Sequence, residues 1–244
     1  MKTEKRNLLG FLLLTLIFAS ALFLFCLAEA HLSSRNTQSV LSKGEYTVVL
    51  DAGHGGEDGG ASSASGILEK DLNLTIAKQL GEYLEQCGIR VIYTRTEDIL
   101  LYDKTQDYQG RKKILDLAAR YQIARACENG VFVSIHMNAF PQTQYSGLQV
   151  YYSPHHPLSE SLAAKIQKNV KEQLDTDNQR KIKKADSSIY LLDRLEKPAI
   201  LIECGFLSNK AEAEKLANAE YQEQLTAIIG QSIIDAMESA TQLQ

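Results

Sequence analysis

Short apolar runs that alternate with amphipathic stretches most constrain how this chain can fold. Three of the runs, Tyr46–Asp51, Val131–His136 and Ala199–Glu203, have the apolar character of buried strands. After the first run, apolar side chains recur at helical spacing, which predicts a helix that opens at Glu69 and stops at Gly88. Strands that alternate with helices predict an α/β fold: a single domain with a mixed, mostly parallel twisted sheet flanked by helices on both faces.

The other expected elements follow the same alternation. Further strands are predicted at 89–94, 147–152 and 189–192. Further helices are predicted at 111–127, 158–174, 211–217 and 221–237. The first of these helices is expected to turn five residues to one face: Ile114, Leu117, Ala118, Tyr121 and Ala124. The polar stretches 96–110 and 175–188 are expected to be loops.

Residues 1–30 have the composition of a targeting segment. A basic start (Lys2, Lys5 and Arg6) precedes an apolar run over residues 8–27, which as a helix would be roughly 30 Å long. Residues 28–30, Ala-Glu-Ala, match the small-x-small pattern of a signal-peptide cleavage site. A cleaved signal peptide and an uncleaved N-terminal membrane anchor both fit, and lipidation at Cys26 is a third option.

Each of these options exports the rest of the chain. The polar, non-periodic residues 31–45 are expected to form a linker, and residues 46–244 the globular domain. The expected location is outside the cytoplasmic membrane, secreted or membrane-anchored, with membrane contact only through the N-terminal segment. The length of 244 residues suffices for one such domain with a full core.

Charge and cysteine usage exclude several classes of protein. The net charge of −4 argues against a nucleic-acid binder. The four cysteines, at positions 26, 87, 127 and 204, have no C-x-x-C spacing, which argues against a structural zinc–thiolate site and a disulfide framework.

A glycine-rich turn follows the first strand and contains one histidine, His54. Five of the eight residues from Gly53 to Gly60 are glycines, which allow positive φ angles and close approach of another group. Neither a Walker lysine nor a G-x-G-x-x-G pattern accompanies the turn, so nucleotide binding is disfavoured against a metal-ligand histidine.

Titratable side chains stand at the ends of three strands: His54, His136 and Glu203. In a parallel sheet these ends converge on one edge, where ligand sites form. Imidazole and carboxylate suit Zn²⁺, and a catalytic zinc keeps three protein ligands with one open position. The residues alone leave the third ligand open among Glu57, Asp58, Glu69 and Glu203; Glu69 is favoured only by its place at a helix start.

Four stretches form an ordered set along the chain. They are VVLDAGHGGEDGGA from Val48, GILEKDLNL from Gly66 leading to VIYTR, VFVSIHMNAF from Val131, and PAILIECGFLSN from Pro198. Together they resemble the zinc-dependent N-acetylmuramoyl-L-alanine amidases of bacterial cell walls. The resemblance covers nearly all of residues 46–237 and departs from the usual pattern at Ala52, where proline is common, and at Cys204.

The resemblance implies a site and a reaction. His54, Glu69 and His136 would hold Zn²⁺, and Glu203 would be the catalytic glutamate that takes a proton from water. The implied reaction is hydrolysis of the amide bond between N-acetylmuramic acid and the L-alanine of the stem peptide in peptidoglycan. The family fold, a mixed sheet flanked by helices, agrees with the fold expected above.

Within the family, the chain most resembles the short sporulation- and germination-specific members. A leader joins the catalytic domain directly, the sequence carries no wall-binding repeats, and YQGRKK occurs at 108–113. These features imply action on spore cortex peptidoglycan, in the space between the forespore membranes. They also imply functional coupling to a muramic acid deacetylase in the formation of muramic-δ-lactam, and an activating partner protein is a further expectation.

Two other functions compete with this one. A zinc peptidase that cuts within the stem peptide could use the same ligands. A wall-binding or activator module without catalysis would lack a ligand or Glu203, and the sequence lacks neither.

Some residues are weaker candidates for function. The basic side chains of Arg180, Lys181, Lys183 and Lys184 are candidates for attracting peptide carboxylates, with a solvated loop as the alternative. Arg120 is expected to be structural. Cys204 is expected to fill the core, and His155 and His156 to form a surface turn.

Overall fold

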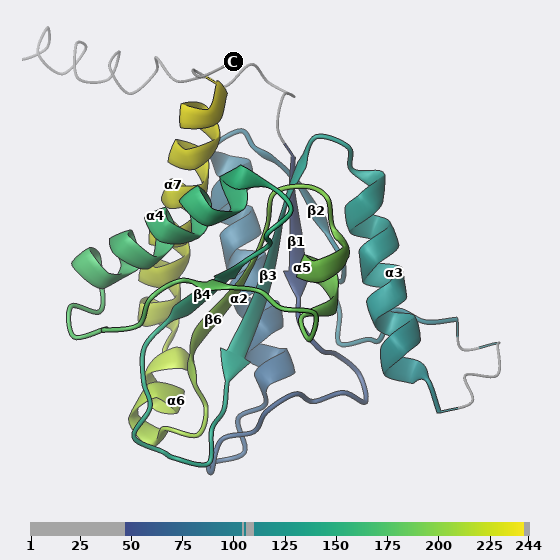
Figure 1. Cartoon of the computed structure of the whole chain (residues 1–244). Coiled ribbons are helices and arrows are strands. Elements are labelled where there is room, and N and C mark those ends of the chain that lie inside the picture. The colour runs from purple at the N-terminus through teal and green to yellow at the C-terminus, as the bar shows by residue number, and fades with distance from the viewer. Residues whose placement is uncertain (1–46, 104, 106–109, 242–244) are drawn as a thin grey trace, which may run out of the picture. The chain divides into compact units, whose positions relative to one another are not determined.

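The computed structural model describes residues 47–103, 105 and 110–241 of the chain (Figure 1). The expected targeting segment and linker, residues 1–45, lie outside this described part and remain predictions. Within the described part, none of the helices combines the length and apolar character that a membrane span needs.

Strands and helices alternate along the described part as the sequence predicts. The strands are β1 (Thr47–Ala52), β2 (Arg90–Tyr93), β3 (Gly130–Asn138), β4 (Gln149–Tyr152), β5 (Lys183–Lys184) and β6 (Ala199–Phe206). The helices are α2 (Glu69–Gln86), α3 (Lys112–Ala126), α4 (Pro157–Gln173), α5 (Tyr190–Arg194), α6 (Lys210–Leu216) and α7 (Ala219–Thr241).

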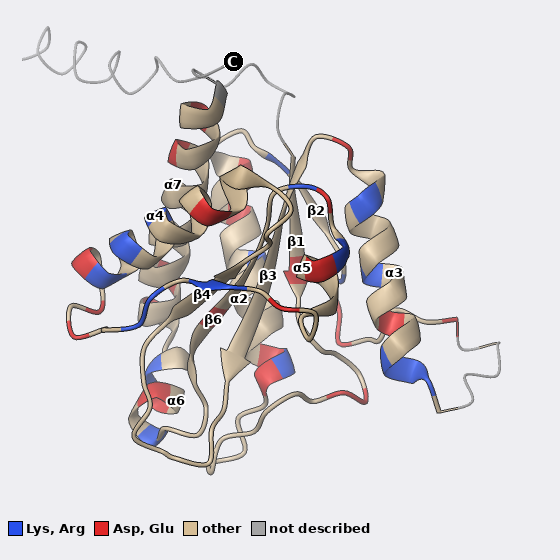
Figure 2. Ribbon diagram, in the orientation of Figure 1, with Lys and Arg blue, Asp and Glu red and all other residues tan. Residues whose placement is uncertain are grey.

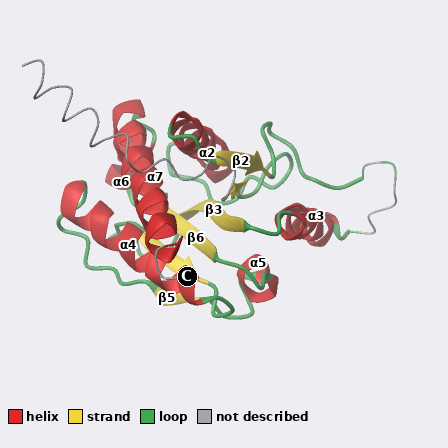
Figure 3. Ribbon diagram, turned by 90° about the horizontal axis from the view of Figure 1, so that it is seen from above, coloured by secondary structure: helices red, strands yellow, loops and turns green. Residues whose placement is uncertain are grey.

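One sheet contains all of these strands, in the order β2-β1-β3-β6-β4-β5. The four strands from β2 to β6 in this order run parallel, β4 runs antiparallel to β6, and β5 runs parallel to β4. Helices cover both faces, with α2, α4 and α7 on one side and α3 and α5 on the other (Figures 1 and 3). The predicted mixed, mostly parallel α/β fold is therefore confirmed.

Alternating side chains of the central strands supply two cores. Val48 and Leu50 of β1 face the core with α2, α4 and α7, whereas Val49 faces the smaller core with α3 and α5. The same alternation in β3 turns Phe132 toward the smaller core. His136, an even number of residues further along β3, therefore lies on the thinly covered α3/α5 face.

Three expectations about single elements were wrong. Residues 189–192 belong to a helix, α5, because Leu191 and Leu192 bury against the smaller core, and a short apolar run fits a buried helix as well as a strand. Lys183–Lys184, expected to be loop, pairs with β4 as β5. Ile114 is 63% exposed, because α3 buries the polar side chains of Asp116 and Arg120 with Ala124.

Candidate metal centre

The carboxyl ends of β1, β3 and β6 bring the predicted site residues to one edge of the sheet. Ala52 at the end of β1 pairs with Ile135, and the next residue of β3, His136, pairs with Glu203 of β6. Because paired residues of adjacent strands lie about 5 Å apart and point to the same face, Glu203 stands beside His136. The convergence expected from the sequence is present.

The turn after β1 folds His54 back toward this edge. Gly53 extends the strand by donating its N–H to Ile135 O (3.1 Å), and Gly55 and Asp58 exchange two backbone hydrogen bonds. Among the described non-glycine residues, only His54 has a positive φ, 60°. A non-glycine residue in this region is strained, and such strain is typical of functional sites.

Two glycines of the turn leave the space that the site side chains occupy. A Cβ on Gly53 would lie 2.2 Å from Nε2 of His136. A Cβ on Gly60, whose φ is +66°, would lie 2.5 Å from Oε2 of Glu69 and 2.8 Å from Cδ2 of His54. The glycines at these positions are therefore required by the site as well as by the turn.

Glu69 enters the site from the first turn of α2 and is almost fully buried. Its Oε2 accepts a hydrogen bond from Ala61 N (2.8 Å), and its Oε1 accepts from Met137 N (3.1 Å) and Asn73 Nδ2 (3.3 Å). Burial alone would raise the pKa of this carboxyl, but the hydrogen bonds with His136 and His54 outweigh it and hold the pKa well below its usual range. Glu69 is therefore a fixed anion.

Both imidazoles face the same oxygen of this anion. Nδ1 of His136 lies 2.9 Å and Nε2 of His54 lies 3.2 Å from Oε1 of Glu69. The potential ligand atoms of the three residues all lie within 4.8 Å of one another. Ligands of a tetrahedral zinc ion are about 3.3 Å apart, so this group could bind such a metal with little rearrangement.

The other acidic candidates for the third ligand do not join this group. Glu57 points to the surface and forms an ion pair with Lys112. Asp58 instead places Oδ2 2.9 Å from Nδ1 of His54, the ring nitrogen that faces away from Glu69. A carboxylate at this position orients a metal-ligating imidazole.

The carboxylate of Glu203 differs from that of Glu69 in its hydrogen bonding and in the direction of its pKa shift. Its Oε2 is buried and has no hydrogen-bond partner among the described residues. Burial raises its pKa to about 7; the charge of Glu69 adds to the rise and those of the histidines oppose it. A cavity of about 250 Å³ beside it is lined by His54, His136, Arg120 and Tyr190, among others. The geometry suits proton exchange with a molecule in this cavity.

The fold and the comparisons with known proteins agree on the family. The model of the N-acetylmuramoyl-L-alanine amidase family matches residues 48–235, which include all four site residues. The chain belongs to this family. Amidase activity on peptidoglycan follows, and the enzyme class expected from the four motifs is confirmed.

Several relatives of this amidase cover most of its length. It is 36% identical to the germination-specific N-acetylmuramoyl-L-alanine amidase of Bacillus subtilis over 227 residues, which are 93% of this chain and 91% of the relative. It is 39% identical to the CwlD amidase of Clostridioides difficile, whose structure was solved in complex with the GerS lipoprotein (TM-score 0.75; 79% of this chain and 98% of that one). AmiC2 of Nostoc punctiforme is 32% identical, with a TM-score of 0.68 over 81% of this chain and 99% of that one.

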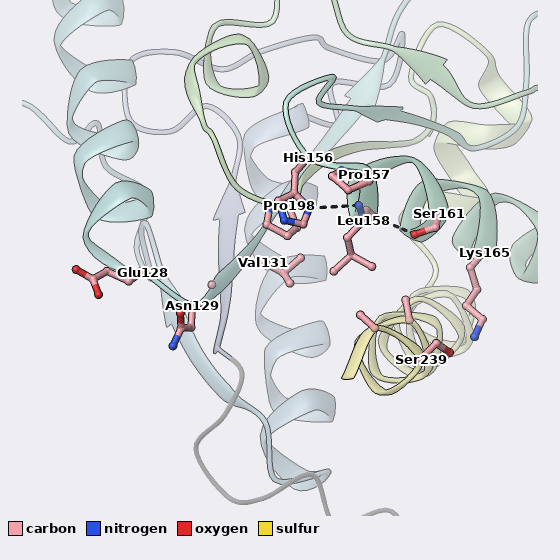
Figure 4. Close-up of a pocket in the computed structure, with 13 residues that line it drawn as sticks. Glu128, Asn129, Val131, His156, Pro157, Leu158, Ser161, Lys165, Pro198 and Ser239 are labelled. Carbon is pink, nitrogen blue, oxygen red and sulfur yellow. Dashed lines mark hydrogen bonds between the residues drawn. The ribbon is translucent and has the colours of Figure 1, made fainter. Parts of the chain in front are cut away.

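A larger cavity of the amidase, of about 800 Å³, lies at the opposite edge of the sheet. It is lined by Val131 near the start of β3, by Pro198 and by residues of α4 and α7 (Figure 4). Its histidine, His156, caps α4 by accepting a hydrogen bond from Leu158 N, in line with the expected surface turn. None of the four site residues lines this cavity, so we place the chemistry in the smaller one.

A buried network beneath the site of the amidase was missed from the sequence, except for the structural role of Arg120. Arg120 donates to carboxylate oxygens of Asp51 and Asp116 (2.7 Å each) and to the backbone oxygens of Ala52 and His54. Arg95 donates to the backbone oxygens of Ala52 and Gly53. The i, i+4 pairing of Asp116 with Arg120 on one helix was the available signal.

We expect Gly53→Ala to weaken zinc binding about 10- to 100-fold. The added Cβ would take the place of the His136 ring, so the ring would have to move away from Glu69. Competition with a chromogenic chelator measures the affinity. Gly59→Ala is the matched control, since its Cβ meets no atom closer than 3.9 Å; equal affinities for the two variants would contradict the expectation.

Proposed function

We propose that this amidase uses Zn²⁺ held by His54, Glu69 and His136, with Glu203 as proton acceptor, to release stem peptides from spore cortex peptidoglycan. The bond cleaved joins the lactyl carbonyl of N-acetylmuramic acid to the nitrogen of L-alanine. The observation that carries the proposal is the group of two imidazoles and one buried carboxylate within 4.8 Å, beside a carboxyl that has an unpaired oxygen.

The donor set fits zinc better than the alternatives. Two neutral imidazoles and one carboxylate form the ligand set of several catalytic zinc sites, in which a fourth position stays open. Zinc in such a site supplies Lewis-acid chemistry, because it acidifies water and polarises a carbonyl oxygen. Oδ2 of Asp58 lies 2.9 Å from Nδ1 of His54, and Met137 N and Asn73 donate hydrogen bonds to the carboxylate of Glu69.

Glu203 moves the proton in this proposal. Its pKa of about 7 lets the carboxylate accept a proton from the attacking water and return it as an acid near neutral pH. The water oxygen bonds to the lactyl carbon, and the proton passes through Glu203 to the alanine nitrogen as the carbon–nitrogen bond breaks.

Spore cortex peptidoglycan is the proposed substrate because a similar amidase is specific to germination. A relative that aligns with 93% of this chain is named for its specificity to germination. The proposal places the enzyme outside the cytoplasmic membrane, in a sporulating cell between the forespore membranes, where a muramic acid deacetylase would act on its product. The CwlD relative solved with a lipoprotein supports a partner protein for this chain too.

Mass spectrometry of digested peptidoglycan tests this function. Zinc-loaded protein should release intact stem peptides that begin with L-alanine, and chelator-treated protein should release none. Cortex peptidoglycan from spores should be cut faster than vegetative peptidoglycan. Stem peptides cut between amino acids would instead support the zinc peptidase, and the absence of any cleavage with metal and partner present would contradict an active amidase.

A further inference from the structure

A strip of basic side chains flanks the site on the side of β4. It consists of Arg180, Lys181, Lys183 and Lys184 and runs along the segment that enters β5 (Figure 2). In the ribbon diagram this segment is blue over nearly its whole length. Such a strip attracts anions, but only a side chain aimed at the site can select a substrate.

The strip is fixed against the sheet by specific contacts. Buried Asn178 donates to Leu148 O (2.9 Å) and accepts from the backbone N–H of Arg180 (2.9 Å). Gln149 of β4 donates to the backbone oxygen of Lys181 (2.7 Å). Beyond it, β5 pairs with Tyr151 and Tyr152 of β4. The backbone that carries the basic residues is therefore held in place.

Of the four basic residues, Arg180 is the one whose side chain contacts the neighbour of Glu203 on the sheet. Its guanidinium stacks on the ring of Phe206, 4.7 Å from the centroid, and donates to Oε1 of Gln149. Gln149 is the cross-strand partner of Glu203 in the pairing of β4 with β6. The three lysines are exposed, whereas Arg180 is partly buried.

The charge of Arg180 acts on Glu203, whose pKa it lowers, but Arg180 forms no ion pair within the described part of the chain. Among the described residues no carboxylate lies within ion-pair distance of its guanidinium, and its buried Nε has no hydrogen-bond partner. A partly desolvated arginine without an anion is costly, and a planar guanidinium suits a carboxylate bound through two hydrogen bonds. Its position therefore fits an anion brought by the substrate.

We propose that Arg180 binds the free α-carboxylate of the second stem-peptide residue, the γ-linked glutamate that follows L-alanine, and so selects the acidic over the amidated peptide. This inference rests on the proposed function. In an extended dipeptide that carboxylate is roughly 6 Å from the nitrogen of the bond to be cut. The side chain of Gln149, which pairs with Glu203 across the strands and accepts from Arg180, links the two groups. Stacking on Phe206 keeps the guanidinium in place before the substrate arrives.

Kinetics on two matched substrates test the inference. The substrates are glycan fragments whose stem peptides carry glutamate or isoglutamine at the second position. For the zinc-loaded full-length enzyme, kcat/KM on the acid should exceed that on the amide about 10- to 100-fold, mainly through KM. Arg180→Gln should bring this ratio to about one, because kcat/KM on the acid falls much more than kcat/KM on the amide.

A variant of an exposed lysine of the same strip provides the control. Lys183→Gln removes one charge from the strip and should keep the preference, because Lys183 is exposed and lies over Tyr151. If Arg180→Gln lowered kcat/KM on both substrates by the same factor, with an unchanged unfolding midpoint, Arg180 would only support the structure of the site. A wild-type ratio near one would also overturn the inference.

A binding measurement separates this inference from the proposed reaction. Calorimetry with the free acidic and amidated stem peptides reports Arg180-dependent binding even without turnover. Tighter binding of the acid by the wild type, lost in Arg180→Gln, would support the carboxylate site even if neither glycan fragment were cleaved. If both glycan fragments were cleaved but the acidic and amidated peptides bound with equal affinity, the amidase activity would be supported and the role of Arg180 would be overturned.

Discussion

Glu203→Gln is expected to lower kcat on muropeptides by about 10²- to 10⁴-fold while zinc remains bound at the wild-type stoichiometry. Glutamine has nearly the same shape as glutamate but cannot accept a proton at neutral pH. The side chain of Glu203 makes no hydrogen bond through Oε2 that the substitution would break. Turnover with zinc-loaded protein and the metal content of the same sample measure the two parts of this expectation.

His136→Ala distinguishes activity lost with the metal from activity lost with the proton acceptor. It removes the imidazole that lies 2.9 Å from Glu69, so it should lower both zinc content and activity. Glu203→Gln with activity within a factor of about three of the wild type would mean that another group moves the proton. Glu203→Gln that lost its zinc would make Glu203 a metal ligand, one of the alternatives that the residues alone left open.

The fold could be predicted because its signals are local. Buried parallel strands and amphipathic helices leave apolar patterns within single segments, such as the Leu72, Ile76, Leu80 and Leu84 row that α2 buries. The edge of the site was predictable for the same reason, since strand ends of a parallel sheet converge whatever the loops do. Prediction failed at α5, where a run of few apolar residues fits two structures.

The contents of the site could be predicted only in part from the residues. Glu69 approaches from the start of α2, and nothing in its spacing from His54 and His136 distinguishes it from Glu57 or Asp58. Family resemblance selected it, and the structure then brought it within reach of both imidazoles. The neighbour of Glu203 on β4, Gln149, and the guanidinium beside it depend on an antiparallel pairing that no local pattern encodes.

Replacing Arg120, the buried arginine under the candidate metal centre, is expected to have a large effect on stability. Arg120→Met should lower the free energy of unfolding by about 3–5 kcal/mol, since it leaves the carboxylates of Asp51 and Asp116 buried without their cation. The side chains of Arg120 and Asp51 are only 2% and 1% exposed, so water cannot replace the lost partner. Arg125→Met, at an exposed position of the same helix, is the control and should change stability by less than about 0.5 kcal/mol.

The pH dependence of this loss of unfolding free energy distinguishes the contribution of the Arg120 charge from that of its packing. Burial raises the pKa of Asp51, but Arg120, Ser134 and Thr94 outweigh it and hold the pKa below 3.8, its ordinary value. Ionised Asp51 therefore adds stability that is complete above that ordinary value and is lost as the pH falls through the lowered one. The difference between wild type and Arg120→Met, from urea unfolding, should be larger at about pH 7 than at about pH 3, because protonated Asp51 needs no cation. A deficit that is the same at both pH values would assign the effect to the lost packing of the arginine side chain.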